Sequence, residues 1–230
     1  MQLPSSSLHR IGVAPWRLSG VVCTALLNDP RQLAALGDAV HQAPHKAPPA
    51  HPVLAMRPRN TWAADGDAIA VPADPGLVRT GAGLGIVIGT ACSGVPVARA
   101  LDHVAGYLVA NDLSLPIASH YRPNARLMAR DGFCPLGATV VPAAGVADPD
   151  ALAVRLLIDG RPSWQGSTGG RTRGVARLVS DVSGFMTLMP GDVLLLGIDA
   201  DAPTARIGQA MTVEIAGIGR LHNTLVAEAA

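Results

Sequence analysis

Short apolar runs separated by turn residues dominate the hydrophobic pattern of this chain. Residues 21–27 form a β-branched run that ends at Asn28-Asp29-Pro30, which is typical of a strand followed by a turn. Asp159-Gly160, placed between two further runs, predicts a tight hairpin. Other apolar runs predict strands at 53–56, 69–71, 84–88, 107–110, 138–141, 154–158, 193–196 and 211–215.

Few segments carry apolar residues at helical spacing. Residues 31–41 and 97–103 predict short helices, and residues 175–185 predict a longer one with a single apolar face. Many strands with few helices predict a β-rich α+β fold of the barrel or sandwich kind. We expect an N-terminal arm over residues 1–20, with an early strand near residues 11–13, and one domain over residues 21–230.

Composition and charge exclude several classes of function. A net charge of +1 at pH 7 gives no electrostatic basis for binding nucleic acid or anionic membranes. Cys23, Cys92 and Cys134 are too far apart in sequence to indicate a zinc site or a disulfide framework. No apolar run approaches the length of a membrane span, and the N-terminus lacks the pattern of a secretion signal. We expect a cytoplasmic protein.

Asp112 is the first residue that points to chemistry. It ends the apolar run in GYLVANDLSLP (106–116), where a carboxylate stands at the mouth of a predicted strand. The run TGAGLGIVIG (80–89) offers only Gly81 and Gly83 where partner carboxylates would be needed. A cation such as Mg²⁺ prefers several oxygen ligands, so the pattern indicates a metal-enzyme scaffold with an incomplete metal site. The alternative is that Asp112 closes a strand-end turn through side-chain hydrogen bonds.

Seven segments in order resemble the fumarylacetoacetate hydrolase family across residues 21–225. They are Asn28 after a strand, RPRN (57–60), LGIVIG (84–89), AGYLVAND (105–112), DGFCPLG (131–137), MPGDV (189–193) and GIGRLHN (217–223). Within the family, HKAPP (45–49), RPRNT, NDLSLP, HYRP (120–123) and RDGFCP resemble the N-terminal half of the isomerase/decarboxylases of 4-hydroxyphenylacetate (homoprotocatechuate) degradation. The resemblance implies a mixed β-roll around a central cavity, with a few short helices.

The same resemblance implies a metal-dependent chemistry. Family members hold Mg²⁺ or Mn²⁺ with two glutamates and one aspartate, and the metal stabilises an enolate as a Lewis acid. Asp112 falls on the aspartate, whereas Gly81 and Gly83 fall on the two glutamates. Met128 falls on an active-site lysine, and Gln32 on a histidine that serves as general base in hydrolytic members. Asp112 is therefore the one metal ligand expected from this chain.

Several arginines are candidates for binding an acidic substrate. A guanidinium matches the geometry of a carboxylate, so Arg57 and Arg59 can bind a dicarboxylate, helped by Tyr121 and Arg122. The alternative for Arg57 and Arg59 is pairing with Asp65 or Asp67 at the surface.

His120 and Arg130 join Asp112 as candidate catalytic residues. A histidine titrates near physiological pH and can act as acid or base, and Arg130 is placed beside the expected cavity. The alternatives are an exposed loop for His120 and a structural role for Arg130.

Three functions remain open from the sequence. The first is the N-terminal subunit of a 2-hydroxyhepta-2,4-diene-1,7-dioate isomerase / 5-oxopent-3-ene-1,2,5-tricarboxylate decarboxylase, paired with a homologous metal-binding C-terminal subunit. The second is a homodimeric enzyme that uses arginines in place of a metal. The third is a non-catalytic scaffold or diacid-binding protein of the same fold, because a fold alone does not fix a function.

Overall fold

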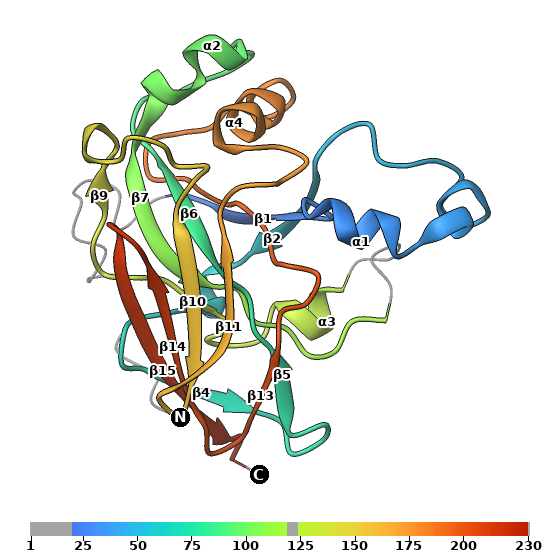
Figure 1. Ribbon diagram of the computed structural model, residues 1–230, viewed down its shortest axis with the longest axis vertical. Coiled ribbons are helices and arrows are strands. Elements are labelled where there is room, and N and C mark those ends of the chain that lie inside the picture. The colour runs from blue at the N-terminus through green and yellow to red at the C-terminus, as the bar shows by residue number, and fades with distance from the viewer. Residues whose placement is uncertain (1–19, 119–123, 230) are drawn as a thin grey trace.

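Two β-sheets form the body of the protein. The computed structural model describes residues 20–118 and 124–229, and Figure 1 shows the strands as two layers with short helices at the periphery. The first sheet has the order β2 (Val53–Arg57), β1 (Val22–Leu26), β12 (Val193–Leu195), β6 (Ala82–Ile88), β7 (Val104–Asn111), β9 (Val141–Pro142). The second has the order β11 (Arg161–Ser167), β10 (Ala153–Ile158), β14 (Ala210–Ile215), β15 (Gly219–Ala227), β4 (Ala68–Val71). The predicted β-rich fold is confirmed.

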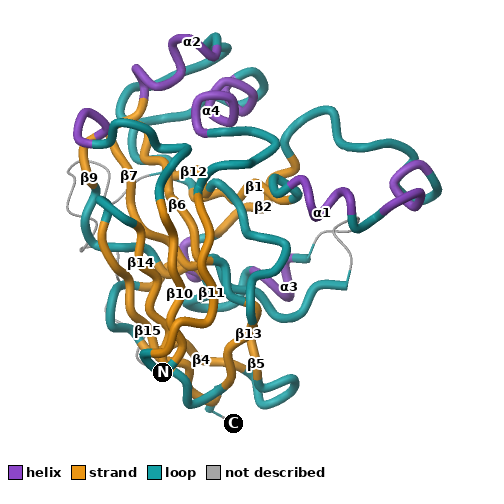
Figure 2. Tube along the Cα trace, viewed as in Figure 1, coloured by secondary structure: helices purple, strands orange, loops and turns teal. Residues whose placement is uncertain are grey.

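Short elements complete the described part of the chain. Two strand pairs lie outside the main sheets: β13 (Thr204–Arg206) with β5 (Leu77–Arg79), and β3 (Trp62–Ala63) with β8 (Cys134–Pro135). The α-helices are α1 (Pro30–Ala34), α2 (Val97–Ala100), α3 (Ala125–Met128) and α4 (Val175–Ser183). The 3₁₀ turns are η3 (Gly37–His41), η4 (Arg59–Thr61), η5 (Leu101–His103) and η6 (Ala143–Gly145). Figure 2 shows how much of the remaining chain is loop.

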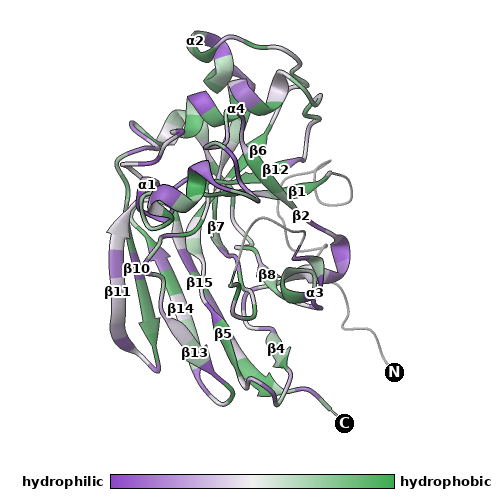
Figure 3. Ribbon diagram, turned by 90° about the vertical axis from the view of Figure 1, so that its right-hand side faces the viewer, coloured by the Kyte–Doolittle hydropathy of each residue, from purple (hydrophilic) through white to green (hydrophobic). Residues whose placement is uncertain are grey.

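The core lies between the inner faces of the two sheets. Leu84 and Ile86 of β6 and Val109 of β7 belong to the same buried cluster as Leu156 of β10 and Val213 of β14. In Figure 3 the apolar colour marks much of β10, β6 and β12. With few aromatic residues in the chain, most of the interior is filled by aliphatic side chains, joined by the buried Tyr107 and Phe133.

Local sequence explains two elements well. Asp159 and Gly160 both have positive φ, as the central pair of a two-residue hairpin requires, and β10 and β11 pair directly around them. In α4 the buried residues include Leu178, Val179 and Val182, so the predicted apolar face is confirmed. The Asp150 carboxylate accepts a hydrogen bond from the backbone N–H of Val175 and satisfies a donor in the first turn of α4.

Other predicted elements differ from the structure. Residues 31–41 form α1 and η3 rather than one helix, with Gly37 at a positive φ where η3 begins. The strand predicted at 138–141 is wrong except at Val141, where the two-residue strand β9 begins. The long strand β15 was not predicted, although its buried Leu221, Asn223 and Leu225 alternate with more exposed residues.

Residues 30–52 form an arm that extends from the sheets, as Figures 1 and 2 show. No residue of α1 is buried, and the helix is fixed mainly at its first turn, where the Asp29 side chain caps it. Farther along, the guanidinium of Arg173 donates to the carbonyl of Ala50 at 2.9 Å. None of the helices in the described ranges is long and apolar enough for a bilayer span.

Candidate functional site: a sealed ion pair and a charged pocket

Asp112 and Arg57 form an ion pair inside the protein. Asp112 follows the last residue of β7, and Arg57 is the last residue of β2, so two strands of one sheet deliver the two groups. The guanidinium Nη2 of Arg57 contacts the Oδ1 of Asp112. The side chain of Arg57 is 0% exposed and that of Asp112 is 3% exposed, so solvent does not reach the pair.

Backbone carbonyls hold the guanidinium in place. Nη1 of Arg57 donates to the carbonyl of Met128, and Nη2 donates to the carbonyl of Leu113 at 3.2 Å. Burial raises the pKa of Asp112, while the Arg57 guanidinium and the Thr24 hydroxyl act against that rise by favouring the carboxylate. A buried charge needs a partner of this kind, because an isolated one costs several kcal/mol or more.

Glycine at position 81 allows a close backbone approach beside this pair. The N–H of Asp112 donates to the carbonyl of Gly81 at 2.9 Å, and the N–H of Gly81 donates to Oδ1 of Asn111 at 2.9 Å. A Cβ atom at position 81 would lie 2.2 Å from the backbone oxygen of Asp112, so any side chain there would require the backbone to move apart. At Gly83 the nearest atom would be the backbone oxygen of Gly197, at 3.3 Å.

These residues do not fit a divalent cation. The two positions expected to carry glutamate ligands supply no side chain, and one oxygen of Asp112 already contacts a cation, the Arg57 guanidinium. Within residues 20–118 and 124–229 there is no group of three or more His, Cys, Asp or Glu side chains arranged to hold a metal ion. A Mg²⁺ or Mn²⁺ ion prefers several oxygen ligands, which this centre does not offer.

The structure brings together some of the predicted residues and separates others. Arg57 pairs with Asp112, so the alternative that it pairs with Asp65 or Asp67 at the surface is wrong; Asp65 accepts from the N–H of His222 instead. Arg59 lies exposed in η4. The candidates His120, Tyr121 and Arg122 and the expected early strand near residues 11–13 lie outside the described residues.

Arg130 is tied to the C-terminal end of the chain. Its Nη2 donates to both carboxylate oxygens of Glu228, at 2.9 and 2.7 Å, and its side chain is 26% exposed. The guanidinium also lies 6.0 Å from the centre of the Phe133 ring. One guanidinium nitrogen thus holds both oxygens of Glu228 in an ion pair, and the catalytic role of Arg130 stays a prediction.

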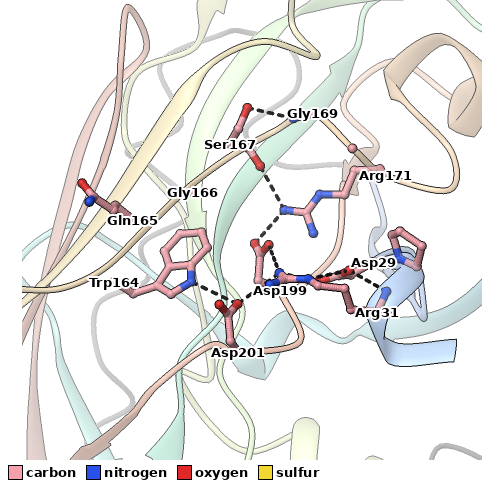
Figure 4. Close-up of a pocket in the computed structure, with 12 residues that line it drawn as sticks. Asp29, Arg31, Trp164, Gln165, Gly166, Ser167, Gly169, Arg171, Asp199 and Asp201 are labelled. Atoms are coloured by element: carbon pink, nitrogen blue, oxygen red, sulfur yellow. Dashed lines mark hydrogen bonds and ion pairs between the residues drawn. The ribbon is translucent and has the colours of Figure 1, made fainter. Parts of the chain in front are cut away.

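A separate pocket of about 310 Å³ lies between β11, the start of α1 and the loop after β12. Figure 4 shows three aspartates and two arginines meeting there beside the indole of Trp164. The Arg31 guanidinium contacts the carboxylates of Asp29, Asp199 and Asp201 at 2.8, 3.1 and 3.1 Å. The pocket is large enough for a small organic acid.

The second arginine of the pocket is more deeply placed. The Arg171 side chain is 4% exposed, and its Nη2 donates to Oδ2 of Asp199 at 2.7 Å. Burial raises the pKa of Asp199, although Arg171 and Arg31 oppose that rise. For Asp29 burial also opposes ionisation, but hydrogen bonds from Arg31 and from the N–H of Ala200 outweigh it, and the pKa is lowered.

Asn28 holds the walls of this pocket together. Its side-chain amide donates to the carbonyls of Leu196 and Arg173, at 2.8 and 2.9 Å, and its oxygen accepts from the N–H of Arg173 at 2.9 Å. Asn28 is 2% exposed. Its side-chain hydrogen bonds connect the residues that follow β1 to the loop after β12 and to the loop before α4. The sequence marked Asn28 as part of a motif, but the pocket residues around it were not predicted, because they come from three widely separated stretches of the chain.

Comparisons with known proteins agree with this architecture. The model of the family "Fumarylacetoacetate (FAA) hydrolase C-terminal" matches residues 21–226. The 4-hydroxyphenylacetate degradation bifunctional isomerase/decarboxylase of Escherichia coli is 37% identical over 215 residues, which cover 92% of this chain and 48% of that protein. The chain therefore spans about half the length of this relative.

Solved structures show the same fold. The 5-carboxymethyl-2-hydroxymuconate delta-isomerase of Mycobacterium smegmatis superposes with a TM-score of 0.75 at 29% identity, covering 93% of this chain and 81% of that one. Fumarylpyruvate hydrolase of Pseudomonas aeruginosa, solved in complex with Mn²⁺ and pyruvate, gives a TM-score of 0.75 at 24% identity, covering 90% of each chain. Taken with the match over residues 21–226, these likenesses show that the chain belongs to the fumarylacetoacetate hydrolase family.

Proposed function

We propose that this chain is the N-terminal-type subunit of a 2-hydroxyhepta-2,4-diene-1,7-dioate isomerase / 5-oxopent-3-ene-1,2,5-tricarboxylate decarboxylase in aromatic catabolism. The observation that carries the proposal is the match to about half of the bifunctional Escherichia coli enzyme, over 92% of this chain. A homologous subunit would supply the other half. Mycobacterium smegmatis delta-isomerase, with the same fold, supports a role in isomerisation.

In this assembly the chain acts as the supporting half. The Asp112 carboxylate is occupied by Arg57 and shielded from solvent, so it is poorly placed to act on a substrate. The divalent metal expected for the family would then be bound by the partner subunit, which would carry the residues that stabilise an enolate. This chain would contribute an interface and the walls of a cavity.

The test is turnover of the tricarboxylate and of the dienedioate, followed by ultraviolet absorbance with saturating Mg²⁺. We expect the purified chain alone to be inactive and its mixture with the homologous subunit to be more active than that subunit alone. An Asp112→Ala variant of this chain should lower the melting temperature and leave the specific activity of the folded mixture unchanged. Full activity of this chain alone, lost in a normally folded Asp112→Ala variant, would refute the proposal.

The charged pocket favours a second candidate, a diacid-binding protein without catalysis. Arg31 and Arg171 face a space of about 310 Å³ together with Trp164, and guanidinium groups bind carboxylates in bidentate fashion. Isothermal titration with heptanedioate, a saturated seven-carbon diacid, tests this. Binding that an Arg31→Met variant weakens at least tenfold, with no turnover in any mixture, would favour this candidate over the first.

A further inference from the structure

We infer that Arg57 is a built-in cation that takes the place of a divalent metal at Asp112, so that this centre neither needs nor accepts a metal ion. The inference concerns the chain itself and holds whichever reaction its assembly performs. It starts from the partner of Asp112. The family resemblance implies a metal ion at this carboxylate, whereas the structure shows the guanidinium of Arg57, from a strand of the same sheet.

The first argument is that the guanidinium is fixed on several sides. Besides Asp112 it binds the carbonyls of Met128, at the end of α3, and of Leu113, just after β7. A metal ion that bound Oδ1 of Asp112 would have to displace the guanidinium from that oxygen. Displacement would leave a positive charge in a site where the side chain is 0% exposed, and burying an unpaired charge is strongly unfavourable.

The second argument is that the neighbouring backbone excludes further ligands. A side chain at position 81 would collide with the backbone oxygen of Asp112, because its Cβ would lie 2.2 Å from that atom. The carbonyl of Gly81 is itself used, since it accepts the N–H of Asp112 at 2.9 Å. Glycine at 81 and arginine at 57 therefore belong to one arrangement: the first lets the strands close tightly, and the second neutralises the carboxylate that they enclose.

Direct metal binding is the first experiment. The electron paramagnetic resonance signal of free Mn²⁺ is measured while Mn²⁺ is added to the full chain and to an Asp112→Asn variant. We expect no Mn²⁺ to bind at Asp112 in the wild-type chain. The wild type and the Asp112→Asn variant should therefore give the same titration curve. Any binding that persists in Asp112→Asn lies elsewhere and agrees with the inference. Stoichiometric binding by the wild type that Asp112→Asn abolishes would overturn it.

Chemical rescue is the second experiment, because it asks whether a cation is needed at this place. An Arg57→Ala variant should melt on the order of 10 °C below the wild type, and about 50 mM guanidinium should recover about 2 °C of that loss while sodium chloride at equal ionic strength does not. Arg155→Ala is the matched control, since Arg155 pairs with Glu214 at the surface with 64% of its side chain exposed. Guanidinium should only lower its melting temperature.

If Arg57→Ala does not fold, Arg57→Lys keeps the inference testable. Lysine retains the charge but loses the fork that binds two carbonyls and a carboxylate, so we expect a folded protein with a lowered melting temperature. A melting temperature of Arg57→Ala equal to that of the wild type would overturn the inference, and so would an Arg57→Lys variant no more stable than a folded Arg57→Met variant, in which the charge is lost. The inference would also fail if Mn²⁺ raised the melting temperature of the wild type but not of Asp112→Asn.

Discussion

Removing one partner of the Arg57–Asp112 pair should cost far more stability than removing both. An Arg57→Met change keeps most of the aliphatic length but leaves the Asp112 carboxylate in a site where it is 3% exposed. Breaking a buried pair in this way typically costs about 3–5 kcal/mol. For a chain of this size each kcal/mol lowers the melting temperature by roughly 2–4 °C, so the expected loss is on the order of 10 °C.

The second change reverses part of that loss. Asp112→Asn removes the charge with almost no change in shape, and a buried amide without full hydrogen bonding costs about 1–3 kcal/mol, less than a buried unpaired carboxylate. In the wild type Asp112→Asn should therefore destabilise the protein, whereas in the Arg57→Met background it should recover about 2 kcal/mol. The specific prediction is that Asp112→Asn lowers the free energy of unfolding in the wild type and raises it in the Arg57→Met background.

Urea unfolding of the four proteins measures the cycle at equilibrium, with the slope of the transition confirming a common unfolded state. Arg155→Met serves as the control, because its partner Glu214 lies at 2.8 Å on an exposed face of the second sheet. Exposed pairs contribute about 0–1 kcal/mol, so this variant should stay close to the wild type. If Asp112→Asn destabilises both backgrounds equally, the two residues are not energetically coupled and the reasoning from the buried pair fails.

Three further predictions concern the surrounding structure. Gly81→Ala should lower stability by about 1–3 kcal/mol in chemical unfolding and Gly83→Ala by less, since only the first adds a Cβ within 2.2 Å of a backbone atom. Asn28→Ala should cost about 3 kcal/mol, because two carbonyls lose a buried donor; an unchanged melting temperature would contradict this. Asp29→Asn should cost about 1 kcal/mol near pH 7. The pKa of Asp29 is lowered, so its contribution is present above its unfolded value and is lost as the pH falls through the folded value; the difference from the wild type should disappear in acid unfolding measurements.

Local patterns predicted the elements that depend on neighbours in sequence. The apolar runs of β6 and β7, the Asp159-Gly160 hairpin and the buried face of α4 all follow from periodicity and turn chemistry. β15 was missed because its buried positions include Asn223, whose polarity hides the alternation. The side-chain nitrogen of Asn223 donates inside the protein to the carbonyls of Ala64 and Asp67, at 2.8 and 3.0 Å.

The sites could be predicted only in part, because their contacts cross long distances in sequence. The glycines at 81 and 83 are visible in the sequence, but the partner of Arg57 is not one of the acids near it in sequence; it is Asp112, which directly follows β7 far along the chain. One clue was available. Arg57 ends an apolar strand, and a charged residue in such a place requires a buried partner, for which Asp112 at the end of another apolar run was the matching choice.

The Arg57–Asp112 pair and the pocket at Arg31 differ in how far a ligand can reach them. This difference indicates which of the two can contact a substrate or a partner subunit. The Asp112 carboxylate has 3% exposure and a bound guanidinium, so its charge acts on the stability of the fold rather than on a molecule in solution. The pocket at Arg31 is open, because that side chain is 55% exposed while it bridges three aspartates. Of the three partners Asp201 is the exposed one, at 58%, and exchanging an exposed pair of this kind for another carboxylate costs about 0–1 kcal/mol. A substrate carboxylate, or an acidic side chain of a partner subunit, would thus meet this chain more readily at the pocket than at Asp112.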